Sequence, residues 1–71
     1  MTTLNKTVGQ RKLRVIADKY TQEAVARKCR VSQSVISRWI TGARKPTYEN
    51  RTVLADKYGI DLDAWERPNH G

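Results

Sequence analysis

Residues 21–42 read TQEAVARKCRVSQSVISRWITG, and this stretch decides the fold. Thr21 and Ser32 are residue types that often cap the N-terminus of a helix, and Gly42 is a typical helix stop. Between these signals the apolar residues recur at helical spacing. The stretch therefore predicts two short helices joined by a tight turn, each with one face turned towards a shared core.

The same spacing shows which side chains these two helices bury. On the first helix, Val25, Ala26 and Cys29 form the apolar stripe, and Ala26 is small enough for another helix to cross closely. Cys29 is the only cysteine, so it cannot form an internal disulfide, and we interpret it as a small buried apolar residue. On the second helix, the residues expected to face inward are Val35, Ile36, Trp39 and Ile40.

Helical spacing continues on both sides of this pair. A helix over residues 8–20 is expected to turn four side chains inward, namely Leu13, Ile16, Ala17 and Tyr20. A later helix, from about residue 47 to residue 57 or 58, ends at Gly59 and has a stripe of Val53, Leu54 and Tyr58. A last turn over residues 61–66, capped by Asp61, carries Leu62 and Trp65. We predict an all-α, compact bundle of about five short helices, with residues 1–66 as one domain and 67–71 as a flexible tail.

Charge is distributed unevenly along the 71 residues, whose formal net charge is +7. Residues 1–45 hold eleven basic and two acidic residues, whereas residues 46–71 hold three basic and five acidic ones. This asymmetry favours a basic face for a polyanion over general solubility alone. No apolar run approaches the roughly 20 residues of a membrane span and no signal peptide follows Met1, so we expect no membrane partner and a cytoplasmic location.

The outer face of the second helix of the pair carries the candidate DNA-reading residues. The major groove of B-DNA admits one α-helix, which must project polar side chains from one exposed face near its N-terminus. Gln33 can pair with adenine and Arg38 with guanine, and a good pair of this kind is worth about 1–3 kcal/mol of discrimination. Ser34 and Ser37 can contact a base edge or a phosphate, although serine is also common on solvated surfaces. Val35 either touches a thymine methyl group or packs partly in the core.

Several short motifs stand in a characteristic order along the chain. They are TQE at 21–23, VSQSVISRW at 31–39, GARKP at 42–46, and GIDLD at 59–63 followed by Trp65. Through them the chain resembles the Cro/CI type of helix-turn-helix proteins, also called the XRE family, over roughly residues 9–66. The resemblance implies a lambda-repressor-like fold. It also implies a sequence-specific, double-stranded DNA-binding transcriptional regulator, in particular a small Cro-like repressor of phage or bacterial origin.

The resemblance also implies how the other contacts are divided. Gln22 lies at a helix N-terminus, where free backbone N–H groups favour an anion, and family glutamines at this place hold a phosphate. The other expected phosphate contacts are Thr41, Arg44 and Lys45. Family members bind palindromic operators as two-fold dimers, and the candidates for the dimer contact are Tyr58, Leu62 and Trp65. Each of these three can instead complete the core of the monomer. No cofactor, metal or small-molecule ligand is implied.

Four features depart from the family pattern, one of them being that Trp39 and Trp65 are bulkier than the common residues. Arg30 stands where the turn usually has glycine, so we expect that turn to be tighter or more helical. The end of the first helix is about one residue shorter. Many members pair an arginine of the first helix with a glutamate just before the position of Gly42. Here Ile40 takes the second place and we align Ala17 with the first, so we expect an apolar contact in place of the ion pair.

Other functions remain alternatives on the sequence alone. Antitoxins and restriction-modification controllers share the fold, and neighbouring genes would separate them from a repressor. From a different class, the chain could be a protein-interaction adaptor, although Arg44 and Lys45 argue against that function. An enzyme is the least supported alternative, because the chain has one histidine (His70), one cysteine and no catalytic or phosphate-binding spacing.

Overall fold

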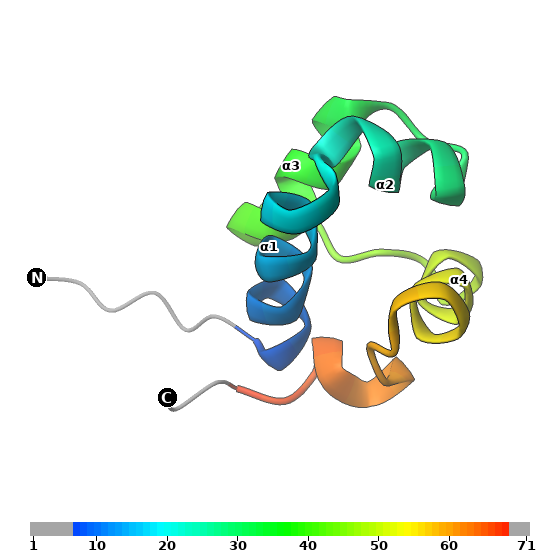
Figure 1. Cartoon of the computed structure of the whole chain (residues 1–71). Coiled ribbons are helices and arrows are strands. Elements are labelled where there is room, and N and C mark those ends of the chain that lie inside the picture. Colours follow the sequence, from blue (N-terminus) through cyan, green and yellow to red (C-terminus); the bar gives the residue numbers. More distant parts are fainter. Residues whose placement is uncertain (1–6, 69–71) are drawn as a thin grey trace, which may run out of the picture.

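Four α-helices and one 3-10 helix make up the structure, a computed structural model that describes residues 7–68 (Figure 1). In chain order they are α1 (Val8–Tyr20), α2 (Gln22–Cys29), α3 (Gln33–Thr41), α4 (Tyr48–Tyr58) and the 3-10 helix η1 (Leu62–Trp65). The predicted all-α bundle of about five short helices is therefore confirmed, with the last helix of the 3-10 type.

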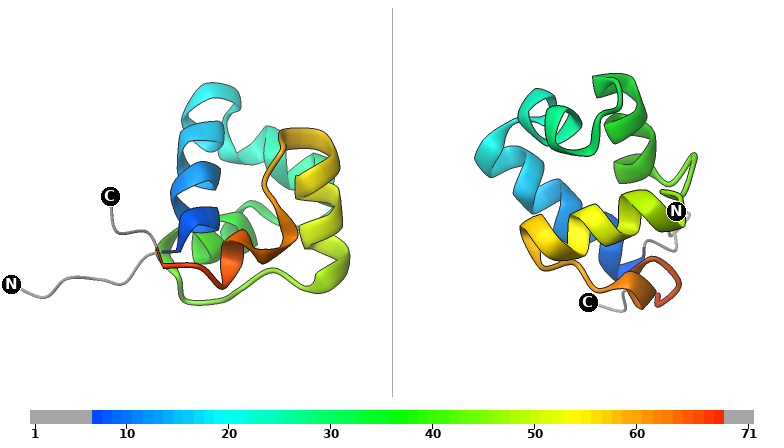
Figure 2. Two further views of the ribbon diagram at one scale, coloured as in Figure 1. Left: turned by 90° about the horizontal axis from the view of Figure 1, so that it is seen from below. Right: turned by 90° about the vertical axis from the view of Figure 1, so that its right-hand side faces the viewer.

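Helix α1 packs against three other elements of the fold. It contacts α2, α3 and η1, while α4 packs against α2 and η1. In the right-hand view of Figure 2, α1 lies at the left, α4 crosses the front and α3 lies at the upper right. The outer side of α3 is thus remote from the side where α1 and α4 approach each other. Within residues 7–68, no helix combines the length and the apolar character needed to span a membrane.

Threonine side chains cap three of the helices, among them α1 and α4. The Thr7 hydroxyl accepts a hydrogen bond from the Gln10 N–H at 3.2 Å, and the Gln10 side-chain oxygen accepts one from the Thr7 N–H at 2.7 Å. This reciprocal pair is a capping box at the start of α1. Thr47 caps α4 by accepting from the Asn50 N–H at 3.3 Å. These bonds satisfy backbone donors that a helix leaves unpaired in its first turn.

Thr21 alone separates α1 from α2. Its N–H donates to the Ala17 carbonyl at 2.8 Å, and its hydroxyl accepts from the Ala24 N–H at 3.1 Å. One residue therefore ends α1 and also caps α2, as predicted for the cap. To do both, it adopts φ 86° and ψ 150°, a region that a β-branched residue rarely occupies. We attribute this backbone to the short connection expected from the sequence.

Left-handed backbone ends three helices. Gly42 and Gly59 have φ values of 90° and 75° after α3 and α4, as predicted for helix stops. Arg30 ends α2 with φ 59° and ψ 43°. The expectation of a tighter or more helical turn at Arg30 is therefore wrong. The turn keeps its left-handed form because the next N–H, that of Val31, reaches back to the Ala26 carbonyl at 3.0 Å.

The core draws on every helix. Its largest fully buried side chains are Leu13, Val25, Ile36, Leu54, Ile60 and Trp65. The predicted burial of Val25, Ala26 and Cys29 is confirmed, since none is more than 5% exposed. Tyr20 was expected to face inward from α1 but is 48% exposed, because it is the last residue of the helix. Ile60, which belongs to no predicted stripe, is fully buried just after Gly59.

The last described residues are part of the fold. The Val8 N–H donates to the Arg67 carbonyl at 2.9 Å, and Thr7 forms an isolated β-bridge with Pro68. Of the tail predicted over residues 67–71, Arg67 and Pro68 thus contact the start of α1, and the flexibility of the tail stays a prediction. The rest of that predicted tail, including His70, lies outside the described residues.

Candidate nucleic-acid interface

The orientation of α3 is fixed by two buried side chains. Ile36 and Trp39 are 0% and 3% exposed and hold one face of the helix against the core. The opposite face leaves Gln33, Ser34 and Arg38 exposed, while Ser37 is half-buried. The residues predicted to read bases thus share the outward side of one short helix. Val35 is half-buried and packs against the core, which favours its packing role over the thymine contact.

Two serine hydroxyls form a hydrogen bond with each other at the N-terminus of α3. The hydroxyls of Ser32 and Ser34 lie 3.0 Å apart, and either can be the donor. Ser32 makes no side-chain capping bond to the helix, although it occupies the predicted N-cap position. To contact a base or a phosphate, Ser34 must therefore share its hydroxyl with Ser32 or exchange that partner.

The predicted phosphate contacts lie at two places beside α3. Gln22 is the first residue of α2 and is half-buried, whereas Thr41, Arg44 and Lys45 are exposed around the end of α3. The Thr41 hydroxyl and the Arg44 N–H both donate to the carbonyl of Arg38, each at 3.3 Å. These bonds fold the basic loop, residues 42–47, back over the C-terminal end of α3.

Glu66 ties this basic loop to the C-terminal part of the domain. One carboxylate oxygen accepts from the Lys45 ammonium at 2.8 Å and the other from the Arg51 guanidinium at 3.0 Å. Arg51 also donates through Nε to the Pro46 carbonyl at 3.0 Å. One of the predicted phosphate-binding cations is therefore already paired with an anion of its own chain.

The two cations also shift the titration of the Glu66 carboxyl. Hydrogen bonds from Lys45 and then from Arg51 hold its pKa below the ordinary value. A carboxyl with a lowered folded-state pKa adds stability at pH above its unfolded pKa, and loses this contribution as the pH falls through the folded pKa. Sequence reasoning missed Glu66, because it lies 21 residues from Lys45 and 15 from Arg51, and no local spacing links them.

The three candidates for a dimer contact do not form one exposed patch. Trp65 is only 1% exposed, which favours the alternative that it completes the core of the monomer. Leu62 is 38% exposed on η1. Tyr58 is half-buried, and its ring centroid lies 5.8 Å from that of Tyr20 on α1. Leu62 and the accessible part of Tyr58 are what this surface offers to a second copy.

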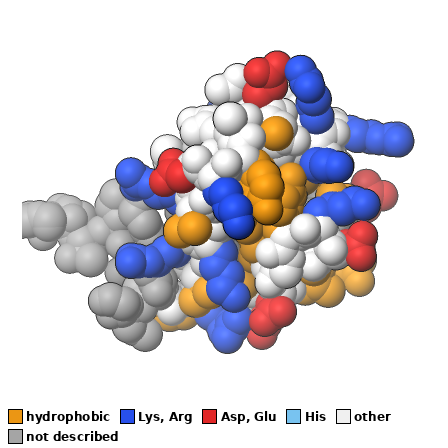
Figure 3. All heavy atoms as spheres, in the orientation of Figure 1, with side chains coloured by type: hydrophobic (Ala, Val, Ile, Leu, Met, Phe, Trp, Pro, Cys, Tyr) orange, Lys and Arg blue, Asp and Glu red, His pale blue; other side chains and the backbone are white. Residues whose placement is uncertain are grey.

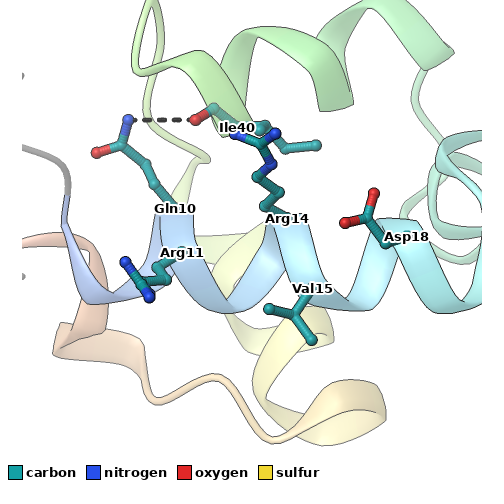
Figure 4. Close-up of a pocket in the computed structure, with 6 residues that line it drawn as sticks. All are labelled: Gln10, Arg11, Arg14, Val15, Asp18 and Ile40. Atoms are coloured by element: carbon teal, nitrogen blue, oxygen red, sulfur yellow. Dashed lines mark hydrogen bonds between the residues drawn. The ribbon is translucent and has the colours of Figure 1, made fainter. Parts of the chain in front are cut away.

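A depression between α1 and the end of α3 shows how Ile40 is accommodated (Figure 4). Arg14 extends from α1 towards Ile40, and both line the depression. Ala17 is buried and 7% exposed, and its contact with Ile40 stays a prediction; Arg14 lies beside Ile40 in the depression. The polar link between the two helices comes from Gln10, whose side-chain amide donates to the Ile40 carbonyl at 3.4 Å.

Cys29 behaves as a buried apolar side chain. It lies in the core, and burial raises the pKa of its thiol, so the neutral form prevails at neutral pH. Across residues 7–68, the structure gathers no three His, Cys, Asp or Glu side chains into a group that could hold a metal ion.

Comparison with known proteins identifies the class to which this fold and this outward polar helix belong. A protein-family model described as helix-turn-helix, of the Cro/CI or XRE type, matches residues 10–65, which is most of the chain. The chain belongs to this helix-turn-helix family, whose members are DNA-binding domains and not enzymes. No curated protein and no solved structure matches the chain, so this assignment rests on the family model. The chain is therefore a DNA-binding protein of a family of transcriptional regulators.

Proposed function

We propose that the protein is a sequence-specific transcriptional regulator, a Cro-like repressor that binds a palindromic operator as a homodimer. The observation that carries this proposal is the outward polar face of α3, set by the burial of Ile36 and Trp39. That face lies beside two further features suited to a DNA backbone, the N-terminus of α2 and the basic loop. Such a regulator acts where the DNA is, in the cytoplasm of a bacterial cell.

In this proposal the exposed residues divide into two groups. The base-reading residues are Gln33, Ser34, Ser37 and Arg38. The phosphate contacts are Gln22, Thr41, Arg44 and Lys45. Base contacts give sequence preference, whereas phosphate contacts fix the register and make binding depend steeply on salt.

The proposed dimer contact is centred on Leu62. A single exposed leucine with the edge of Tyr58 is a small apolar surface, so we expect dimerisation to be weak without DNA and to be completed on the operator. Sedimentation of the protein with and without operator DNA measures this directly. Leu62→Asp should leave the monomer folded and should abolish the two-protomer complex.

Selection from a pool of random duplex DNA, near physiological salt, tests the proposal. We expect an enriched motif with two-fold symmetry and half-sites about one helical turn apart. Arg38→Ala should then lose preference at one base of each half-site, by about 1–3 kcal/mol. The matched control is Arg27→Ala, which removes an arginine of α2 that pairs with Glu23 at 3.0 Å. This control should keep the base preference.

Two outcomes would contradict the proposal. Retention of DNA without any enriched motif would leave a non-specific nucleic-acid binder. If Arg38→Ala and Arg27→Ala changed the enriched motif in the same way, α3 would not be the helix that reads the bases.

A further inference from the structure

A second surface feature lies where α1 and α4 approach each other. It is a groove of about 310 Å³ lined by Arg11, Lys12, Val15, Ile16, Tyr58 and Gly59. We call it the α1–α4 groove. Its volume is near the lower end of the roughly 300–1,000 Å³ of ligand pockets, which suits one or two side chains of a partner. DNA recognition by α3 makes no use of this groove.

Apolar side chains form the floor of the groove and continue along α1. Val15 is 62% exposed, and Tyr20, which lies one turn after Ile16, is 48% exposed. Ile16 and Tyr58 are half-buried, and Tyr20 lies 5.8 Å from Tyr58 between ring centroids. Figure 3, drawn in the orientation of Figure 1, shows hydrophobic surface across the middle of this side. Contiguous apolar surface with a polar rim marks interaction sites more often than scattered apolar residues do.

The rim of the groove is positively charged. Arg11 and Lys12 line it, and no carboxylate is among its lining residues. The Lys19 ammonium lies 5.4 Å from the centre of the Tyr20 ring and adds a third cation along the same helix. The acidic neighbour on α1, Asp18, lines the adjoining depression beside Ile40, which shares Arg11 and Val15 with the groove. Lys and Arg side chains border the hydrophobic surface in Figure 3.

The apolar floor and the positively charged rim together favour some occupants of the groove over others. DNA is disfavoured, because an apolar floor gives nothing to a phosphate backbone and α3 lies on the other side of α1 (Figure 2). A second copy docked by two-fold symmetry would bring Arg11 and Lys12 against the same cations of its partner, and such like-charge contacts are unfavourable. The dimer proposed above, centred on Leu62, shares only Tyr58 with the lining of the groove.

We propose that the α1–α4 groove binds a segment of another protein that presents a large apolar side chain flanked by carboxylates. The apolar side chain enters between Val15, Ile16 and Tyr58, and the carboxylates pair with Arg11 and Lys12. The regulator thereby has a protein-binding side in addition to its DNA-reading helix α3, and the two sides share no residue.

The test selects a phage-displayed library of random peptides on the immobilised full-length protein, without DNA. We expect the enriched peptides to carry an apolar residue between Asp or Glu residues. Their affinity, measured by fluorescence polarisation, should fall on the order of tenfold for Lys12→Glu and for Val15→Asp. The matched control, Lys57→Glu, makes the same charge change on α4 outside the lining and should bind as the original protein does. Circular dichroism establishes that each variant is folded.

Three results would overturn the proposal. They are no enrichment, enriched peptides without acidic residues, and equal loss of binding for Lys12→Glu and Lys57→Glu. A change in sedimentation for folded Lys12→Glu would also overturn it, because the groove would then serve self-association. DNA selection is measured separately, so failure here leaves the proposed DNA-binding function standing.

Discussion

At the scale of single residues, α2 is flanked by two residues with unfavourable backbone conformations. Thr21 precedes the helix with φ 86°, and Arg30 follows it with φ 59°. Such conformations cost of order 1–3 kcal/mol each and persist where the surroundings require them. Here the requirement is geometric, because Thr21 alone connects α1 to α2 and Arg30 begins the short connection from α2 to α3. The strain therefore lies in the helix pair that presents Gln22 and the reading face.

Arg30→Gly is expected to raise the free energy of unfolding by about 0.5–1 kcal/mol. Glycine removes a left-handed penalty of about 1–2 kcal/mol, and part of the gain is offset by about 0.4–1 kcal/mol of added entropy in the unfolded chain. Urea unfolding followed by circular dichroism measures the change.

The control for this prediction is Arg30→Ala. Alanine keeps the left-handed penalty but removes the exposed guanidinium, so it should not stabilise the protein. Equal effects of glycine and alanine would trace the change to the arginine side chain and contradict the backbone explanation.

At the scale of elements, the end of η1 controls a loop that follows the reading helix. Glu66 holds Lys45 at 2.8 Å and Arg51 at 3.0 Å, and Arg51 in turn holds the Pro46 carbonyl. The Lys45 and Glu66 side chains are both more than half exposed, so water and salt weaken their attraction. An incoming phosphate therefore competes with Glu66 for the same ammonium group.

Glu66→Gln is expected to tighten binding to DNA about two- to fivefold, the scale of an exposed ion pair. Lys45 then neutralises phosphate without first leaving a carboxylate, and a repelling charge disappears. The salt dependence of log K should steepen by about 0.9, the value for one additional phosphate contact. Titration of fluorescent duplex DNA at several salt concentrations measures both effects.

Asp63→Asn is the matched control for Glu66→Gln. It removes a carboxylate from the 3-10 helix that Glu66 follows, but that carboxylate lies 3.6 Å from the Arg67 guanidinium and not beside the basic loop. An unchanged salt dependence in Asp63→Asn and a steeper one in Glu66→Gln are expected. If both variants behaved alike, the effect would come from net charge and Lys45 would lose its phosphate role.

At the scale of the whole molecule, Trp65 packs the 3-10 helix η1 against the start of α1. A Cβ placed on Gly9 would clash with the Trp65 ring, so the ring lies directly on the backbone of α1. The ring nitrogen is buried without a hydrogen-bond partner among the described residues, so the ring contributes through packing. The hydrogen bond from Val8 to Arg67 adds to this contact.

Gly9→Ala is expected to lower the free energy of unfolding by about 1–3 kcal/mol, because its methyl group forces the Trp65 ring out of place. Urea unfolding measures the loss, and tryptophan fluorescence should report a more solvated ring. DNA affinity should change less than stability, since Gly9 is remote from the reading face of α3.

A double-mutant cycle with Trp65→Leu checks this explanation. In the Trp65→Leu background the ring is absent, so Gly9→Ala should cost less, with a coupling energy of about 0.5–3 kcal/mol. An equal cost in both backgrounds would show that the glycine serves α1 itself and not the contact with Trp65.

Local sequence patterns predicted the elements well. The helix stops at Gly42 and Gly59 and the caps at Thr21 and Ser32 lie where predicted, because a cap depends on residues within one turn of it. The burial of Cys29 and the outward position of Gln33 and Arg38 followed from helical spacing for the same reason. The polar face proposed to read DNA was thus visible in the sequence alone.

Tertiary structure decided what depends on distant partners. Trp65 is buried in the core, the Arg67 carbonyl accepts a hydrogen bond from the start of α1, and Glu66 pairs with Lys45. Tertiary structure also created the α1–α4 groove from two helices whose sequences show only ordinary amphipathic stripes. The sequence by itself determined the helices and the outward face of α3, because hydrogen bonds and helical periodicity act over a few residues. Only the tertiary structure decided which charges meet and which apolar side chains stay exposed, because burial is settled by segments far apart in the chain.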